Sequence, residues 1–358
     1  MDKLKGIYIL ILLFIMAVGG KYMTGNNPED KATRIIQKFM NENQMPGLSI
    51  AVGQNGEVVW RNGFGLANVE QQIPVTTDTR FRIGSVSKTV TSAAVGRLID
   101  QHKLNLDATV QAYVPSFPEK RWPITTRQSM GHLAGIRHYR GQEMLRNTFY
   151  PKVLDGLVIF KDDTLLHEPG SKYHYSSYGW NLVSAVIEGA SGLDFLSYME
   201  DSVFVSLALE TMMGEHRDST LYPITSFYNI KNGNPILAPE VDNSYKWAGG
   251  GFVGTPTDMV KFIQNIYGTS FISESALAEI QRPLQLNDGK STQYGLGWRH
   301  QKDFWRNKII GHSGGSTGGR AMLINYPEND ITVAILVNSG SGGNLNRLAQ
   351  RIASRFMK

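Results

Sequence analysis

The chain has 358 residues, of which 41% are hydrophobic and 19% charged, so it is long enough for one large globular domain or two small ones. Its formal net charge of +5 is dispersed without a Lys/Arg-rich run, which argues against a nucleic-acid-binding protein. The absence of cysteine excludes disulfides and thiolate metal sites.

The N-terminal segment has the pattern of an export signal. Two lysines precede an uncharged apolar run over 7–18, and Ala17-Val18-Gly19 offers small residues for cleavage. The run is short for a membrane span, which needs about 20 residues. We predict that residues 1–25 are a signal peptide or, as a second interpretation, a short membrane anchor over residues 6–20. The protein would then be extracytoplasmic, either periplasmic or secreted.

The chain that follows predicts a helix, then β structure, then a second helix. Apolar spacing of three to four indicates the first helix, and an Asn-Gly turn indicates a hairpin between the first two strands. The predicted elements are a helix within 26–47, strands at 48–52 and 58–60, a third extended segment at 63–67, and a helix over 89–98.

Helices dominate the middle of the sequence, and β structure returns near its end. Helical stretches alternate with proline-bearing loops from 106 to about 202. The clearest later elements are a helix over 181–190 capped at Gly192, a hairpin at 226–233, a helix over 256–267, strands at 321–326 and 331–337, and a helix over 344–357. We predict a single domain over 26–358, with a sheet part at about 26–105 and 240–358 and a helical insertion at about 106–239.

Ser85-Val86-Ser87-Lys88 stands at the start of the helix predicted over 89–98. Positions three apart are neighbours on a helix, so Lys88 would point back beside the Ser85 hydroxyl. A desolvated, neutral lysine can accept the proton of a serine and make it a nucleophile. The motif alone is weak, because chance supplies roughly one such spacing in a chain like this. The alternative is an N-cap serine followed by a solvated lysine.

Two further motifs offer the other groups that a serine hydrolase needs. Tyr175-Ser176-Ser177 follows a Pro-Gly turn and could supply a second acid or base once positive neighbours lower the pKa of Tyr175. The alternative is a packed core tyrosine. His312-Ser313-Gly314-Gly315 could flank a substrate with a cation or hydrogen-bond donor, and its backbone could complete an oxyanion hole with the N–H of Ser85. The alternative is a glycine-rich loop between strands.

The order of these motifs resembles the serine β-lactamase and penicillin-binding protein family, in its branch of class C enzymes, D,D-peptidases and esterases. The resemblance covers nearly the whole chain after about residue 30. Within the family, the sequence looks most like the mitochondrial β-lactamase-like members and their bacterial relatives. The blocks that carry this similarity are 81–88, 132–139, 167–170 and 241–252.

The resemblance implies an α/β (α+β) fold of the β-lactamase/transpeptidase type, with an antiparallel sheet flanked by helices and a mostly helical subdomain. It implies that Ser85 is the acylated nucleophile, Lys88 its base or proton relay and Tyr175 the second acid/base group. Ser177 stands where the family usually has asparagine, and His312 where it usually has lysine. Because a serine has no amide and a histidine is charged only when protonated, both departures argue against an efficient β-lactamase.

We therefore expect a serine hydrolase that forms an acyl-enzyme on a small peptide, amide or ester substrate, without a cofactor, a metal or nucleic acid. The alternative is a self-assembling protein, a homo-oligomer or filament with little turnover, since the mitochondrial members form filaments. The expected substrate-binding and oxyanion residues are Ser177, His312, Ser313, Gly314 and Gly315.

The remaining polar residues of these blocks carry less specific signals. His132 and His138 have no acidic pair at metal-ligand spacing, so we expect them to be structural. Asp242, Asn243 and Lys246 predict either a loop at the mouth of the site or a polar network that holds that loop.

Overall fold

The computed structural model of the protein describes residues 27–216 and 223–357. The predicted signal or anchor over 1–25 lies outside the described residues. Within the described ranges, no helix combines the length and apolar character that crossing a membrane requires. The proposed export therefore still depends on the sequence pattern alone.

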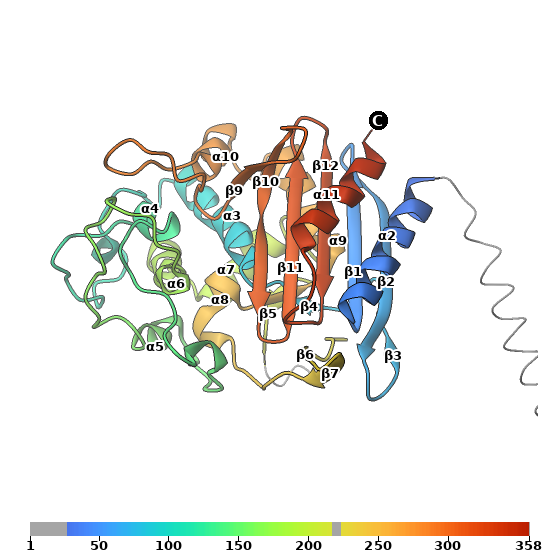
Figure 1. Cartoon of the computed structure of the whole chain (residues 1–358). Coiled ribbons are helices and arrows are strands. Elements are labelled where there is room, and N and C mark those ends of the chain that lie inside the picture. Colours follow the sequence, from blue (N-terminus) through green and yellow to red (C-terminus); the bar gives the residue numbers. More distant parts are fainter. Residues whose placement is uncertain (1–26, 217–222, 358) are drawn as a thin grey trace, which may run out of the picture.

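A seven-stranded antiparallel sheet forms the centre of the molecule, in the order β3-β2-β1-β12-β11-β10-β9 (Figure 1). The two ends of the chain meet in its middle, where Leu48 of β1 lies opposite Val337 of β12. The strands are β1 (Gly47–Gln54), β2 (Glu57–Asn68), β3 (Ile73–Pro74), β9 (Arg299–Lys302), β10 (Lys308–Ser316), β11 (Gly319–Tyr326) and β12 (Ile331–Val337).

Helices cover both faces of this sheet. Successive side chains of a strand point to opposite faces, and alternate apolar residues of β12 accordingly belong to two hydrophobic clusters. One cluster includes α2 (Pro28–Asn43) and α11 (Leu345–Phe356), which lie in front of the sheet in Figure 1. The other includes α3 (Val86–Asp100) and α9 (Pro256–Gly268) on the opposite face.

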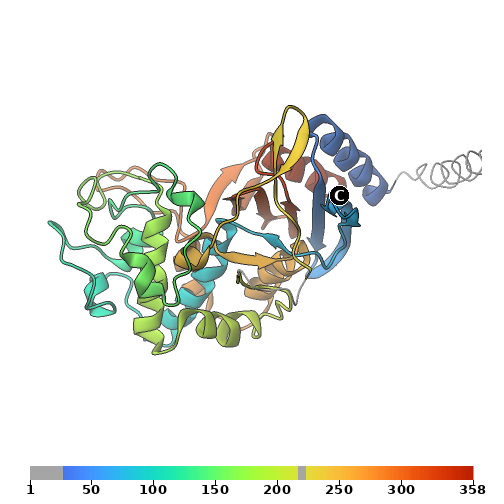
Figure 2. The ribbon, with the colours of Figure 1, turned by 90° about the horizontal axis from the view of Figure 1, so that it is seen from below.

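A mostly helical part lies beside the sheet, as the view from below shows (Figure 2). Its elements and the connecting ones are α4 (Thr126–Met130), α5 (Val153–Leu157), α6 (Ser177–Ser191), α7 (Phe195–Met199), α8 (Trp247–Gly250) and α10 (Glu274–Gln281), with short helical turns at Val110–Ala112, Glu143–Leu145, Glu200–Phe204 and Ser244–Lys246. A separate hairpin pairs β6 (Tyr228–Lys231) with β7 (Asn234–Leu237).

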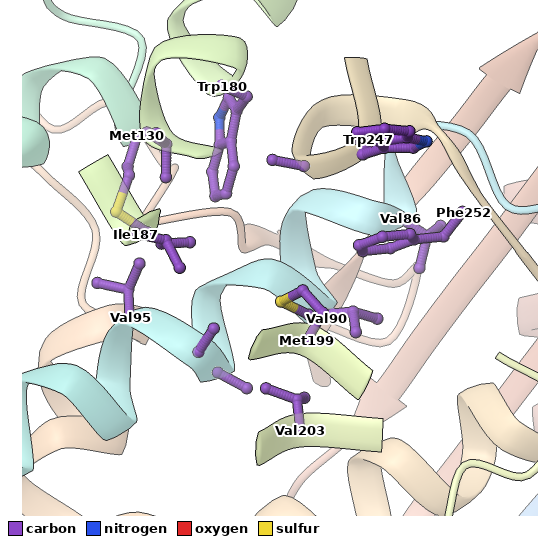
Figure 3. Packing of buried hydrophobic residues seen from close by; sticks show 14 of the residues in the cluster. Val86, Val90, Val95, Met130, Trp180, Ile187, Met199, Val203, Trp247 and Phe252 are labelled. Carbon is purple, nitrogen blue, oxygen red and sulfur yellow. The ribbon is translucent and has the colours of Figure 1, made fainter. Parts of the chain in front are cut away.

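Helix α3 is buried between the sheet and the helical part. Figure 3 shows Val86 and Val90 of α3 among Met199, Val203 and Phe252, each almost fully buried. A helix that is buried on all sides is held by packing rather than by exposed polar contacts. The residue at its N-terminus, Ser85, is therefore fixed in place by the core.

The structure confirms the predicted α+β fold with an antiparallel sheet and flanking helices. It differs from the predicted elements in two places. Residues 63–67 are not a separate strand but the end of β2, because β2 remains paired with β1 as far as Gly65 opposite Gly47. His312 to Gly315 lie within strand β10 rather than in a loop, because the strand continues through both glycines and pairs with β11.

Candidate active site

A small three-stranded sheet leads the chain into Ser85. Strand β4 (Phe81–Arg82) pairs with β8 (Phe252–Gly254), which also pairs with β5 (Met213–Gly214). Gly84 then adopts a φ of +50°, and a Cβ placed there would lie 2.7 Å from the carbonyl oxygen of Gly315. The glycine is needed for both reasons: an L side chain rarely takes this φ, and strand β10 passes directly against it.

Ser85 is the N-cap residue of α3 and is half-buried. The close approach at Gly84 brings the backbone of Gly315 beside it. The backbone N–H groups of Ser85 and Gly315, which the sequence predicts to form an oxyanion hole, thus belong to two segments in close contact.

Lys88 is fully buried, one helical turn after Ser85. Its Nζ lies 3.0 Å from Ser85 Oγ and 3.4 Å from Ser177 Oγ, and it also donates to the carbonyl oxygen of Gly249. The predicted neighbours on the helix are thus in hydrogen-bond contact. Ser177 therefore contacts Lys88 directly.

Burial, with the charge of Arg299 as the second cause, holds the pKa of Lys88 well below its ordinary value. The lowered pKa favours the neutral amine, which has two N–H bonds and one lone pair. In that form Gly249 and Ser177 can accept the two N–H bonds. The lone pair can then accept the proton of the Ser85 hydroxyl, which lies within hydrogen-bond distance.

Two neutral histidines hold the loop that carries Tyr175. The backbone N–H of Ser176 donates to His132 Nδ1, and that of Ser177 donates to His138 Nδ1, each at 3.1 Å. Burial is the first cause that lowers both pKa values, to about 4 for His138 and well below the ordinary value for His132. Each ring can therefore accept a hydrogen bond at Nδ1, and both histidines have the structural role that the sequence suggested.

Tyr175 faces Ser85 and Arg299. Burial raises its pKa, and hydrogen bonding with Ser85 and the charge of Arg299 only partly oppose that rise. The positive neighbour Arg299 lowers the pKa of Tyr175 as predicted, but burial outweighs it, so the net lowering expected from the sequence is wrong. The resting site contains a neutral phenol, which can donate a proton but does not act as the first base.

His312 does not supply a cation to the site, although the sequence allowed for one. Its Nδ1 donates to the carbonyl oxygen of Ser313 at 2.6 Å, and its Nε2 lies 2.9 Å from the hydroxyl of Tyr294. Burial, followed by the charges of Arg299 and Lys88, lowers its pKa well below the ordinary value. Both nitrogens thus serve hydrogen bonds inside the protein, and the ring is neutral.

The rest of this motif lies on an open edge of β10. The pairing of β9 with β10 ends at Gly311 opposite Arg299, so none of the described strands pairs with that edge beyond Gly311. Ser313 and Gly315 are exposed there, while Gly314 is buried against the carbonyl of Ile83. An extended substrate backbone can hydrogen-bond to such an edge.

Arg299 is a site residue that the sequence analysis did not identify. Its guanidinium lies 5.3 Å from the centre of the Tyr175 ring and 5.5 Å from that of Tyr294. Its charge lowers the pKa values of Lys88, Tyr175 and His312. No motif marks this arginine, since it reaches the site only because β9 pairs with β10.

Asn243 belongs to a polar network. It donates through Nδ2 to Glu215, which forms a salt bridge of 2.7 Å with Arg82 just before Ser85. Arg82 also donates to the carbonyl oxygen of Thr317 at 2.7 Å. Of the two predictions for 242–246, the network is the one these contacts favour. Within residues 27–216 and 223–357, no group of three or more acidic or histidine side chains is placed to bind a metal.

Comparison with known proteins agrees with this geometry. The family model described as Beta-lactamase matches residues 32–355. The chain is 28% identical over 442 residues to the mitochondrial serine beta-lactamase-like protein LACTB of Bos taurus, covering 92% of this chain and 79% of that protein. It is 28% identical over 304 residues to the D-aminopeptidase of Gluconobacter oxydans, covering 82% of this chain and 56% of that protein. The octameric penicillin-binding protein homologue from Pyrococcus abyssi has a similar structure, with a TM-score of 0.79 at 24% identity over 91% of this chain and 76% of that one.

A serine in contact with a buried lysine of lowered pKa, and with a tyrosine that faces the serine, has the composition of a serine hydrolase site. The match over residues 32–355 shows that the chain belongs to the β-lactamase family of serine hydrolases.

Proposed function

We propose that the protein hydrolyses a peptide, amide or ester through an acyl-enzyme on Ser85. The observation that carries this proposal is the contact of 3.0 Å between Ser85 Oγ and the amine of Lys88, whose burial lowers its pKa and so favours the neutral form. A neutral amine at this distance can take the hydroxyl proton without a further base. A surface lysine would be protonated and could not do so.

The groups of the site then have distinct roles in each half of the reaction. Lys88 accepts the proton of Ser85 as Oγ attacks the carbonyl carbon, and the N–H groups of Ser85 and Gly315 stabilise the oxyanion. Tyr175 donates its proton to the leaving amine or alcohol and is reprotonated from the Lys88 ammonium. The leaving group departs, and water attacks the acyl ester with the proton transfers reversed, which releases the acid and restores Ser85.

The substrate preference follows from the two departures from the usual family motifs. The neutral His312 provides no fixed charge for the carboxylate of a β-lactam, and Ser177 is committed to Lys88. Both favour peptide, amide or ester hydrolysis over efficient β-lactam hydrolysis. The similarity to a D-aminopeptidase supports an amide substrate. The apolar N-terminal run supports an extracytoplasmic location, with membrane attachment as its second interpretation.

Self-association is the second candidate function. It is favoured by the octameric state of the Pyrococcus abyssi homologue, whose structure resembles this one. Assembly alone gives no physical reason for a buried lysine against a serine, since an unpaired buried amine costs stability. We therefore regard an oligomer as compatible with hydrolysis rather than as a replacement for it.

A hydrolysis panel tests the proposed reaction. We expect wild-type protein to cleave short p-nitrophenyl esters and peptide anilides, including D-Ala-D-Ala peptides in the panel, and to cleave nitrocefin poorly. Ser85→Ala should reduce every activity by at least about 10³-fold, because it removes the nucleophile. Ser116→Ala, which changes an exposed serine near the far end of α6, serves as the matched control and should retain Ser85-dependent turnover. Equal activity of wild type and Ser85→Ala would contradict the proposal.

A further inference from the structure

Lys246 is a second buried lysine close to the site, and the proposed reaction does not use it. Its side chain is only 3% exposed, in the short helical turn directly before α8. Its ammonium lies 5.4 Å from the centre of the Tyr245 ring and 5.7 Å from that of Tyr139. Among the residues that the structure describes, it has no carboxylate in ion-pair contact and no hydrogen-bond acceptor.

The nearest carboxylate is already committed elsewhere. Glu215 attracts Lys246 electrostatically, but its two oxygens accept hydrogen bonds from Arg82 at 2.8 and 3.0 Å and a further one from Asn243. Burial, followed by the charge of Arg82, lowers the pKa of Lys246 to about 7. A buried ammonium without an anionic partner is costly to the fold. An anion arriving from outside would offset that cost and favour the charged form.

Lys246 lies beside the catalytic groups. Tyr139, whose ring it faces, is hydrogen-bonded to Ser177, and Ser177 contacts Lys88. The charge of Lys88 in turn lowers the pKa of Lys246. Tyr139 thus connects Lys246 to Ser177, where the resemblance leads one to expect the longer asparagine.

The two cations lie against different aromatic rings. Arg299 faces the rings of Tyr175 and Tyr294, whereas Lys246 faces those of Tyr139 and Tyr245. If Tyr175 protonates the leaving group, the leaving group lies on the side of Arg299. The acyl group extends from the other side of the scissile carbonyl.

We propose that Lys246 anchors a carboxylate in the acyl part of the substrate. The preferred substrates would then be amides or esters of dicarboxylic acids, or of acidic peptides whose carboxylate lies a few bonds from the scissile carbonyl. This inference rests on the proposed function, because it takes the position of the acyl group from the attack by Ser85. It makes Lys246 a determinant of specificity and not of the chemical step.

Binding to Ser85→Ala protein isolates the anchor from turnover. The probes are the mono-p-nitroanilide of glutaric acid, which carries a free carboxylate, and the corresponding terminal amide, which is neutral and of the same size. By calorimetric titration we expect Ser85→Ala to bind the acid at least tenfold more tightly than the amide. Adding Lys246→Met should remove this preference by weakening the binding of the acid probe alone. Lys246→Arg should keep the preference. Lys103→Met, an exposed lysine after the far end of α3, is the matched control.

Two results would contradict the proposed role of Lys246. One is equal affinity of Ser85→Ala for the acid and the amide, and the other is an equal loss of affinity for both probes when Lys246→Met is added. If Lys246→Met fails to fold, the ratio of the two Kd values in Lys246→Gln decides the question in the same way. Failure of the proposed function has a different signature. In that case wild-type protein would neither cleave these anilides nor differ from Ser85→Ala in the hydrolysis panel.

Discussion

At the scale of single residues, the site depends on what burial does to two titratable groups. It lowers the pKa of Lys88 and raises that of Tyr175, which favours a neutral amine and a neutral phenol. The neutral amine can accept a proton and the phenol can donate one. Arg299, at the exposed end of β9, lowers both pKa values in addition to the larger effect of burial.

Replacing Arg299 should move this pH range. The acid limb of the profile reflects Lys88, which is active only when deprotonated, and the alkaline limb reflects loss of the Tyr175 proton. Arg299→Met removes a charge that lowers both pKa values, so we expect both limbs of kcat/KM to shift to higher pH. Activity below pH 7 should fall accordingly. The measurement is the pH profile with a neutral ester.

Arg299→Lys is the control for this prediction, since it keeps the charge and should leave the profile near that of wild type. A profile of Arg299→Met that is lowered uniformly, without movement along the pH axis, would show that Arg299 does not tune these groups.

Some residues of the site could be predicted from the sequence and others could not. The contact between Ser85 and Lys88 was predictable because both lie on one helical turn. Arg299 was not, because its approach to Tyr175 depends on the pairing of β9 with a distant strand. The pKa of Tyr175 was predicted in the wrong direction because solvent exposure is a property of the fold. Lys246 appeared in the sequence only as one polar residue of a loop.

At the scale of elements, the site is made where β10 crosses the N-terminus of α3. The sequence analysis left open a loop for 312–315, because two adjacent glycines and a serine are typical of turns. The structure instead uses the small residues for close approach: a Cβ at Gly314 would lie 2.0 Å from the Ile83 carbonyl oxygen. Strands β11 and β12 were predictable because no pair of adjacent glycines interrupts their apolar residues.

Gly84→Ala tests this crossing. The new Cβ would lie 2.7 Å from the Gly315 carbonyl oxygen at a residue whose φ is +50°. We expect a loss of about 1–3 kcal/mol in the free energy of unfolding. We also expect a fall in kcat/KM of at least about tenfold, because the two N–H groups proposed for the oxyanion hole would move apart. Urea unfolding and ester hydrolysis measure the two effects.

Gly56→Ala is a matched control for the backbone strain. Gly56 also has a positive φ, of +77°, but a Cβ there would have no neighbour within 4 Å. It should cost some stability and leave kcat/KM unchanged. If Gly84→Ala behaves like Gly56→Ala in both measurements, β10 does not depend on close contact at this point.

At the scale of the whole molecule, the fold could be inferred from the distribution of patterns along the chain. Strand-like segments near both ends and helices between them predicted a sheet to which both ends of the chain contribute, and β1 does pair with β12. The small sheet of β4, β8 and β5 could not be predicted. Its strands are two or three residues long, too short for any period to appear, and only tertiary contacts define them.

The central claim is that Ser85, activated by Lys88, forms a covalent acyl-enzyme. Its most direct test is labelling of the intact protein with a fluorophosphonate probe, followed by peptide mass mapping, with light scattering on the same samples. We expect wild-type protein to carry one probe per chain, attached to Ser85. Ser85→Ala should have the same oligomeric mass as wild type and should carry no probe. A high-mass assembly that takes up no probe, or equal labelling of wild type and Ser85→Ala, would contradict the claim.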